Sequence, residues 1–151
     1  LELQMNRFYA VMLMEDELKK RHFRITPYFR FDRDSEDKLI PEDARLMLEP
    51  KGKPEDVVGA QLQVTINNGP NGAVPYMYAV IICRGRGDSF HSLQHATWVI
   101  PGRSVTIEEG TEGDFAFLII RQSTENAGYH TTDDDCSALA GEVAENIYRL
   151  R

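Results

Sequence analysis

Residues 84–95, RGRGDSFHSLQH, hold more groups capable of chemistry than any other stretch of the chain. Asp88, His91 and His95 lie at positions i, i+3 and i+7, so a helix over residues 89–96 would carry them on one face. Two histidines one turn apart, with a carboxylate, can hold a divalent metal such as Zn²⁺ and leave a fourth position open to water. The spacing makes these residues a candidate metal site, although no HExxH glutamate lies between the histidines.

The same stretch is also a candidate anion site. Gly85 and Gly87 follow an apolar run and precede the possible helix, an order in which backbone N–H groups can point at an anion. Arg84 and Arg86 add positive charge. However, the Walker spacing is absent, and Asp88 would repel an anion. A turn followed by a short helical segment explains these residues without a ligand, and it is the interpretation we favour.

A second basic patch lies in residues 22–31, HFRITPYFRF. The alternation of apolar and polar residues predicts a half-buried strand with Arg24, Tyr28 and Arg30 on its outer face. Pro27 cannot donate a ladder hydrogen bond, so we expect an edge strand or a bulge. Basic residues beside an aromatic side chain can bind an anion or single-stranded nucleic acid. The alternative, which the acidity of the chain favours, is that these charges protect an exposed strand edge from unwanted pairing.

The composition predicts a single globular domain over residues 1–151, with 42% hydrophobic and 27% charged residues. A net charge of −7 makes nucleic acid an unlikely partner and disfavours unspecific attraction to an anionic membrane. No apolar run approaches the roughly 20 residues that a membrane helix needs, so no membrane partner is expected. Cys83 and Cys136 are too few for a disulfide framework and fit no zinc motif. We expect two buried, reduced thiols and a cytoplasmic protein.

Local patterns predict four further elements up to residue 83. Residues 7–14, RFYAVMLM, are an apolar run that we interpret as a strand, with the first turns of a helix as the alternative. Residues 41–48, PEDARLML, begin with proline and acids and predict a short helix. Residues 60–67 alternate and predict a strand. Residues 74–83, VPYMYAVIIC, are apolar on both faces and predict a central strand.

The second half predicts further strands joined by short turns, over residues 97–100, 104–109 and 114–121. A helix follows the acidic residues 132–135, with an apolar stripe at a spacing of four that consists of Leu139, Val143 and Ile147. The sequence therefore predicts an α+β fold, an antiparallel β-meander sheet of about six strands with a C-terminal amphipathic helix packed on one face.

The leading functional prediction is a non-enzymatic binding or assembly module. No arrangement of a nucleophile with a base is evident, and Gly-x-Ser-x-Gly is absent. An edge strand suits strand addition, and Ala140 and Ala144 beside the stripe of the last helix suit helix packing. We therefore expect a protein partner, in the form of a homodimer.

Two other interpretations remain open. The first is a small-ligand or metal-binding pocket protein, or an enzyme, that uses Asp88, His91 and His95 with a divalent metal as its cofactor. Aromatic residues near one end of the sheet would line its pocket, namely Tyr76, Tyr78 and Trp98. The second is an anion or nucleic-acid binder that uses the basic edge strand. A bound ligand would favour the pocket, whereas a large apolar patch closed by a symmetric partner would favour the module.

Overall fold

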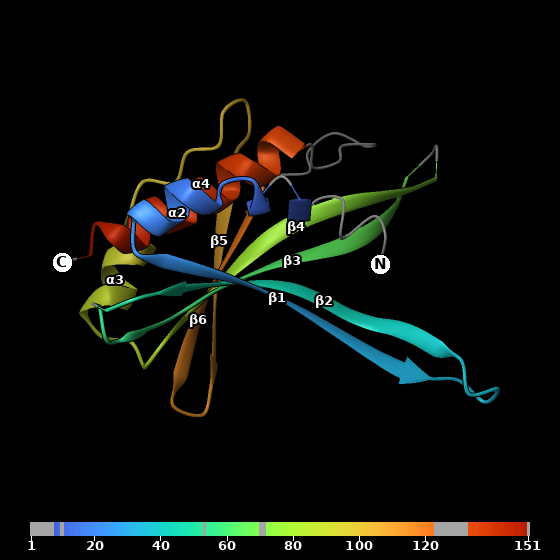
Figure 1. Ribbon diagram of the computed structural model, residues 1–151. Helices are drawn as coiled ribbons and strands as arrows, with labels where there is room; N and C mark the ends of the chain where they lie inside the picture. The colour runs from blue at the N-terminus through green and yellow to red at the C-terminus, as the bar shows by residue number, and fades with distance from the viewer. Residues whose placement is uncertain (1–7, 10, 53, 70–71, 123–132, 151) are drawn as a thin grey trace.

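The computed structural model describes residues 8–9, 11–52, 54–69, 72–122 and 133–150. In this part of the chain, six strands form one sheet and three helices lie beside it (Figure 1). In chain order they are α2 (Glu15–Lys20), β1 (Phe23–Arg33), β2 (Leu39–Pro50), β3 (Val57–Gly69), β4 (Gly72–Cys83), α3 (Asp88–Gln94), β5 (Val105–Glu112), β6 (Phe115–Gln122) and α4 (Asp133–Tyr148). Among the described residues, no helix is both long and apolar enough to cross a membrane.

The sheet is antiparallel throughout, with the strand order β1-β2-β3-β4-β6-β5. Strands β1 to β4 form a meander. After β4 the chain makes α3 and crosses to the far edge, where it forms β5, and β6 then returns between β4 and β5. The predicted α+β fold with a six-stranded antiparallel sheet is confirmed.

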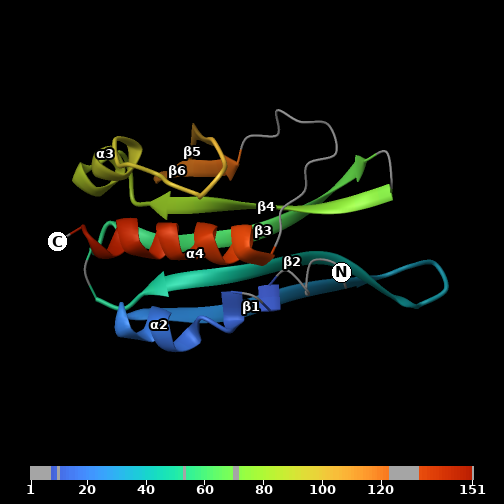
Figure 2. The same ribbon diagram turned by 90° about the horizontal axis from the view of Figure 1, so that it is seen from above.

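The helices lie on one face of this sheet. Figure 2 shows α4 running along the middle strands and α2 beside it over β1, with α3 close to β6. Side chains from the helices and from this face of the sheet form one continuous hydrophobic core. The C-terminal helix carries the predicted stripe into that core, because Leu139, Val143 and Ile147 are fully buried. The predicted packing of this helix on one face is confirmed.

The alanines of α4 also point into the protein's own core. Ala140 and Ala144 are both fully buried within the single chain. They let the helix backbone lie close to the strands, and they are not available to a second copy. Helix packing through these alanines is therefore ruled out as a route to a dimer.

The predicted strand over residues 7–14 is wrong where the structure describes it. Residues 8, 9, 11 and 12 are helical. Phe8 and Val11, three residues apart, are buried, whereas Tyr9 and Met12 are exposed, which is the one-sided burial of a helix. A short apolar run does not distinguish the two structures by itself, and the alternative interpretation, the first turns of a helix, is correct here.

The predicted helix over residues 41–48 is also wrong, because this segment lies within strand β2. Leu46 and Leu48 alternate into the core, opposite Leu62 and Ala60 of β3. Cross-strand burial of these leucines outweighs the local preference of the proline and acids for a helix start. Pro41 is tolerated because it lies at a register shift of the β1–β2 pair.

Strand β1 lies at an edge of the sheet, one of the two positions expected from Pro27; its register shift lies after Arg30, whereas Pro27 itself pairs in register with Leu46. Residues 74–83 lie within β4, between β3 and β6, as predicted for a central strand. Residues 97–100 are not a strand, since only Ile100 forms an isolated bridge, to Arg103. Trp98 instead ties this segment to α3, because its indole Nε1 donates to the Leu93 carbonyl at 3.0 Å.

Candidate functional site

Residues 84–95 form a bend followed by the short helix α3, as predicted. Gly85 has a φ of +80°, a conformation that favours glycine. A distant carboxylate caps the helix: the Ser89 hydroxyl donates to Asp56 Oδ1 at 2.6 Å, and the Ser89 N–H donates to Asp56 Oδ2 at 3.3 Å. A carboxylate of the chain itself thus already accepts hydrogen bonds at the N-terminus of α3.

The arginines of this bend contact their own chain. Arg84 Nε donates to the Glu55 carbonyl at 3.3 Å. Arg86 lies 3.6 Å from a carboxylate oxygen of Glu109, and its guanidinium lies 5.5 Å from the centre of the Phe90 ring. An external anion would have to compete with these contacts, so anion binding by Arg84 and Arg86 stays a prediction without further geometric support.

The three candidate metal ligands are all exposed. Asp88 and His91 lie on α3, whereas His95 follows the last residue of the helix. Within residues 8–150, gaps excepted, no three His, Cys, Asp or Glu side chains form a group that could hold a metal. The metal hypothesis therefore still rests on the sequence spacing alone.

The second pair of candidate anion-binding residues lies elsewhere. Arg24 and Arg30 are exposed on edge strand β1, and β2 and β3 separate that strand from β4, at whose end the bend lies. Arg24 forms an ion pair with Glu49 of β2. The structure therefore places the four predicted arginines in two separate regions and does not unite them in one site.

Within the described part of the chain, the helices leave the opposite face of the sheet uncovered, and we call it the open face. Alternate residues of the strands point to this side, while their neighbours point to the side of the helices. Strand register assigns to it Arg24, Thr26, Tyr28 and Arg30 of β1, Arg45, Met47 and Glu49 of β2, Gln61 and Gln63 of β3, Tyr78, Val80 and Ile82 of β4, Phe117, Ile119 and Arg121 of β6, and Thr106 and Glu108 of β5.

A row of polar contacts crosses the open face at right angles to the strands. Gln61 Oε1 accepts hydrogen bonds from Arg45 and from Gln63 Nε2, each at 3.0 Å. The Tyr78 hydroxyl donates to Gln63 Oε1 at 2.6 Å. The guanidinium of Arg121 lies 5.2 Å from the centre of the Tyr78 ring. These contacts link four strands and hold the side chains of the face in fixed positions.

Apolar side chains lie beside this row. Val80 pairs with Ile119 across β4 and β6, and Ile82 pairs with Phe117. All four are partly exposed, although residues of this kind are usually buried. Phe115, at the start of β6, is 40% exposed. The open face thus combines a row of hydrogen-bonded polar side chains with partly exposed apolar side chains.

Of the residues in this row, Tyr78 alone was expected at a site, as part of an aromatic pocket, and the contacts of the row were not predicted. Alternation in the segment from Gln61 to Val64 does place both glutamines on one face, but their partners on β2 and β6 depend on register, which sequence does not give. The predicted aromatic pocket is divided: Tyr78 lies on the open face, and Trp98 packs against the core beside α3.

Both cysteines are buried, and neither forms a disulfide, as predicted. Burial raises the pKa of the Cys83 thiol to about 11, and the nearby carboxylate of Asp56 adds to the rise. Cys83 is therefore a thiol rather than a thiolate near neutral pH, so it is a poor nucleophile.

No protein-family model, curated protein or solved structure matches this chain. Its function has to be inferred from its own geometry.

Proposed function

We propose that this chain is a non-enzymatic binding module that forms a homodimer through the open face of its sheet. The observation that carries the proposal is the partly exposed apolar surface around Val80 and Ile119, on a face that no described helix covers. When a partner covers such apolar side chains, the complex gains about 25 cal/mol for each Å² of apolar surface removed from water.

The size of the face suits a dimer. Over the eight residues of its shortest strands, β5 and β6, a sheet of six strands with a spacing near 4.8 Å and a rise near 3.3 Å covers roughly 750 Å². A stable interface buries about 800 Å² on each partner. A contact between two copies over this face therefore has the area that a specific dimer needs.

The charges of the face are also suited to a second copy. Arg24 and Arg30 lie on edge strand β1, whereas Glu108 lies on the opposite edge strand, β5. A two-fold axis between the sheets and parallel to the strands places β1 of each copy over β5 of the other. This arrangement brings opposite charges together at both rims, and it places β4 of each copy over β3 of the other and β6 over β2.

Sedimentation velocity of the untagged protein over a concentration series tests the proposal. We expect a dimer for the wild type and at least tenfold weaker association for Ile119→Lys, because the substitution places a charge within the interface. Val99→Lys is the matched control, since Val99 is an exposed valine outside the sheet. A wild-type protein that stays monomeric at high micromolar concentration, or equal weakening by both substitutions, contradicts the proposal.

A second candidate function is the binding of an anionic polymer at one end of the same face. Tyr28 is half-exposed, and it lines a hollow of about 310 Å³ with Arg30 and Arg45. An aromatic ring beside basic groups suits single-stranded nucleic acid, although the chain is acidic overall. Fluorescence anisotropy with a labelled oligothymidylate tests it, and equal affinity of the wild type and an Arg24→Ala/Arg30→Ala double variant dismisses it.

A further inference from the structure

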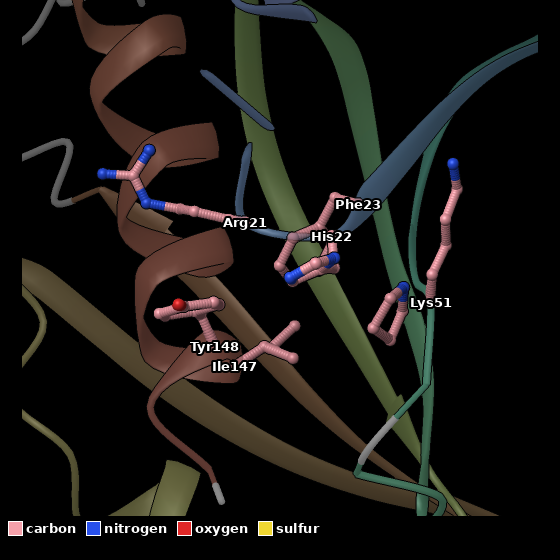
Figure 3. Close-up of a pocket in the computed structure, with 7 residues that line it drawn as sticks. Arg21, His22, Phe23, Lys51, Ile147 and Tyr148 are labelled. Carbon is pink, nitrogen blue, oxygen red and sulfur yellow. The ribbon is translucent and has the colours of Figure 1, made fainter. Parts of the chain in front are cut away.

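A separate cavity lies on the helix side of the sheet, where the end of α4 meets the start of β1 and the end of β2. Its volume is about 350 Å³, within the range of small-molecule sites. Phe23 and Ile147, both buried in the core, form its apolar floor. Figure 3 shows Tyr148 on the α4 side of the cavity and Lys51 on the β2 side, with His22 between them.

The polar groups of this cavity are all basic or neutral. Arg21, His22 and Lys51 line it, and none of the described residues that line it carries a carboxylate, although the chain has more acidic than basic residues. The guanidinium of Arg21 is held by Glu145 of α4 at 2.8 Å and points toward that helix (Figure 3). Within the described part of the chain, the side chains of His22 and Lys51 have no hydrogen-bond or ion-pair partner. They are therefore available to a ligand.

The backbone at His22 holds the imidazole over the cavity. The φ of His22, +60°, lies in the left-handed region, which residues other than glycine rarely adopt. Two backbone hydrogen bonds fix this conformation: the His22 N–H donates to the Lys19 carbonyl at 2.9 Å, and the Lys51 N–H donates to the His22 carbonyl at 2.7 Å. The second bond also fixes the backbone of Lys51 beside His22. A glycine would meet the backbone requirement without strain, so histidine at this position points to a use for its side chain.

We propose that this cavity binds a small organic anion. The apolar body of the ligand lies against Phe23, Ile147 and the ring of Tyr148, and its carboxylate or phosphate group lies between His22 and Lys51. The flexible stem of Lys51 lets its ammonium group close over the anion. The cavity lies on the side of the sheet opposite the open face, so this proposal stands independently of the dimer.

Isothermal titration calorimetry with phenyl phosphate and benzoate tests the proposal. Inorganic phosphate and benzyl alcohol are the comparison ligands, because each has only one of the two required parts. We expect saturable binding of at least one organic anion, and at least tenfold weaker binding of both comparison ligands. Lack of saturable binding of both organic anions, or equal affinity for either comparison ligand, overturns the proposal.

Three variants locate the site. Lys51→Gln removes the ammonium group, and we expect about tenfold weaker binding, the value of one charge-assisted contact. His22→Gly removes the imidazole and suits the backbone, so we expect similar weakening without a fall in melting temperature. Lys38→Gln, an equal charge change in the distant β1–β2 turn, should leave affinity unchanged. Equal weakening by Lys38→Gln and Lys51→Gln, or full binding by both cavity variants, contradicts the assignment.

Discussion

The contact between Asp56 and Ser89 should stabilise α3, and its removal is a quantitative test of the structure. Asp56→Ala deletes two hydrogen bonds at the helix N-terminus, of 2.6 and 3.3 Å. Loss of a helix cap costs about 0.5–2 kcal/mol, and a buried hydroxyl left without a partner costs about 1–3 kcal/mol. Because Ser89 is only 8% exposed, both costs apply, and we expect a loss of about 2 kcal/mol. For a domain of this size, that loss lowers the melting temperature by about 4–8 °C.

Urea and thermal unfolding measure this loss, and the emission of Trp98 reports on α3 directly. Trp98 is the single tryptophan of the chain, and its Nε1 donates to the carbonyl of Leu93 within α3. Loosening of α3 should shift its emission to longer wavelength in the folded variant.

Glu55→Ala is the control, because it removes the same charge from the adjacent, exposed residue. It should change stability by less than about 0.5 kcal/mol. An equal melting temperature for Asp56→Ala and Glu55→Ala, with unchanged Trp98 emission, would refute the role given to this contact.

Two further outcomes are expected. Gly59→Ala should destabilise the sheet by more than about 1 kcal/mol, because Gly59 has a φ of +155° and an added Cβ would lie 2.8 Å from the backbone oxygen of Leu48. Gly110→Ala should be tolerated, because the nearest atom to its added Cβ lies at 3.9 Å. Equal chemical-denaturation curves for the two variants would contradict this prediction. Burial raises the pKa of the Cys83 thiol to about 11 in the folded protein, so above about pH 9 this thiol ionises in the unfolded chain but not yet in the folded one. The free energy of unfolding should therefore fall by up to about 1.4 kcal/mol per pH unit between about pH 9 and pH 11. In unfolding experiments from pH 8 to 11, the free energy of unfolding of Cys83→Ala should fall less steeply with pH than that of the wild type. An equal pH dependence for the two proteins would argue against burial of the thiol.

The parts of the fold that sequence predicted well are those in which local pattern and final burial agree. The stripe of α4 and the apolar run of β4 are buried as their periodicity indicates. Leu139 and Val143 belong to a helix long enough for its period to be unambiguous. Pro27 likewise restricted β1 to an edge or a bulge before any partner strand was known.

The errors arose where distant partners decide the local structure. Strand β2 begins with helix-start residues, but Leu46 and Leu48 gain more from alternate burial against β3 than a short helix would offer. The candidate sites were harder still to predict. The polar row of the open face and the cavity at His22 each combine residues that are far apart in the chain, and only strand register and the docking of α4 bring them together.

The strand order has a consequence for the path by which the chain folds. During synthesis, β4 emerges before β6, so the hydrogen-bonding edge of β4 stays unpaired until residue 122 has been made. Strand β5 cannot pair with β4 directly, since β6 lies between them, so β5 and β6 are expected to form a hairpin and join the meander as a unit. The core then stays open to water until α4 arrives. Docking of α4 is therefore the step that removes the apolar face of these strands from water, and with it a surface prone to aggregation.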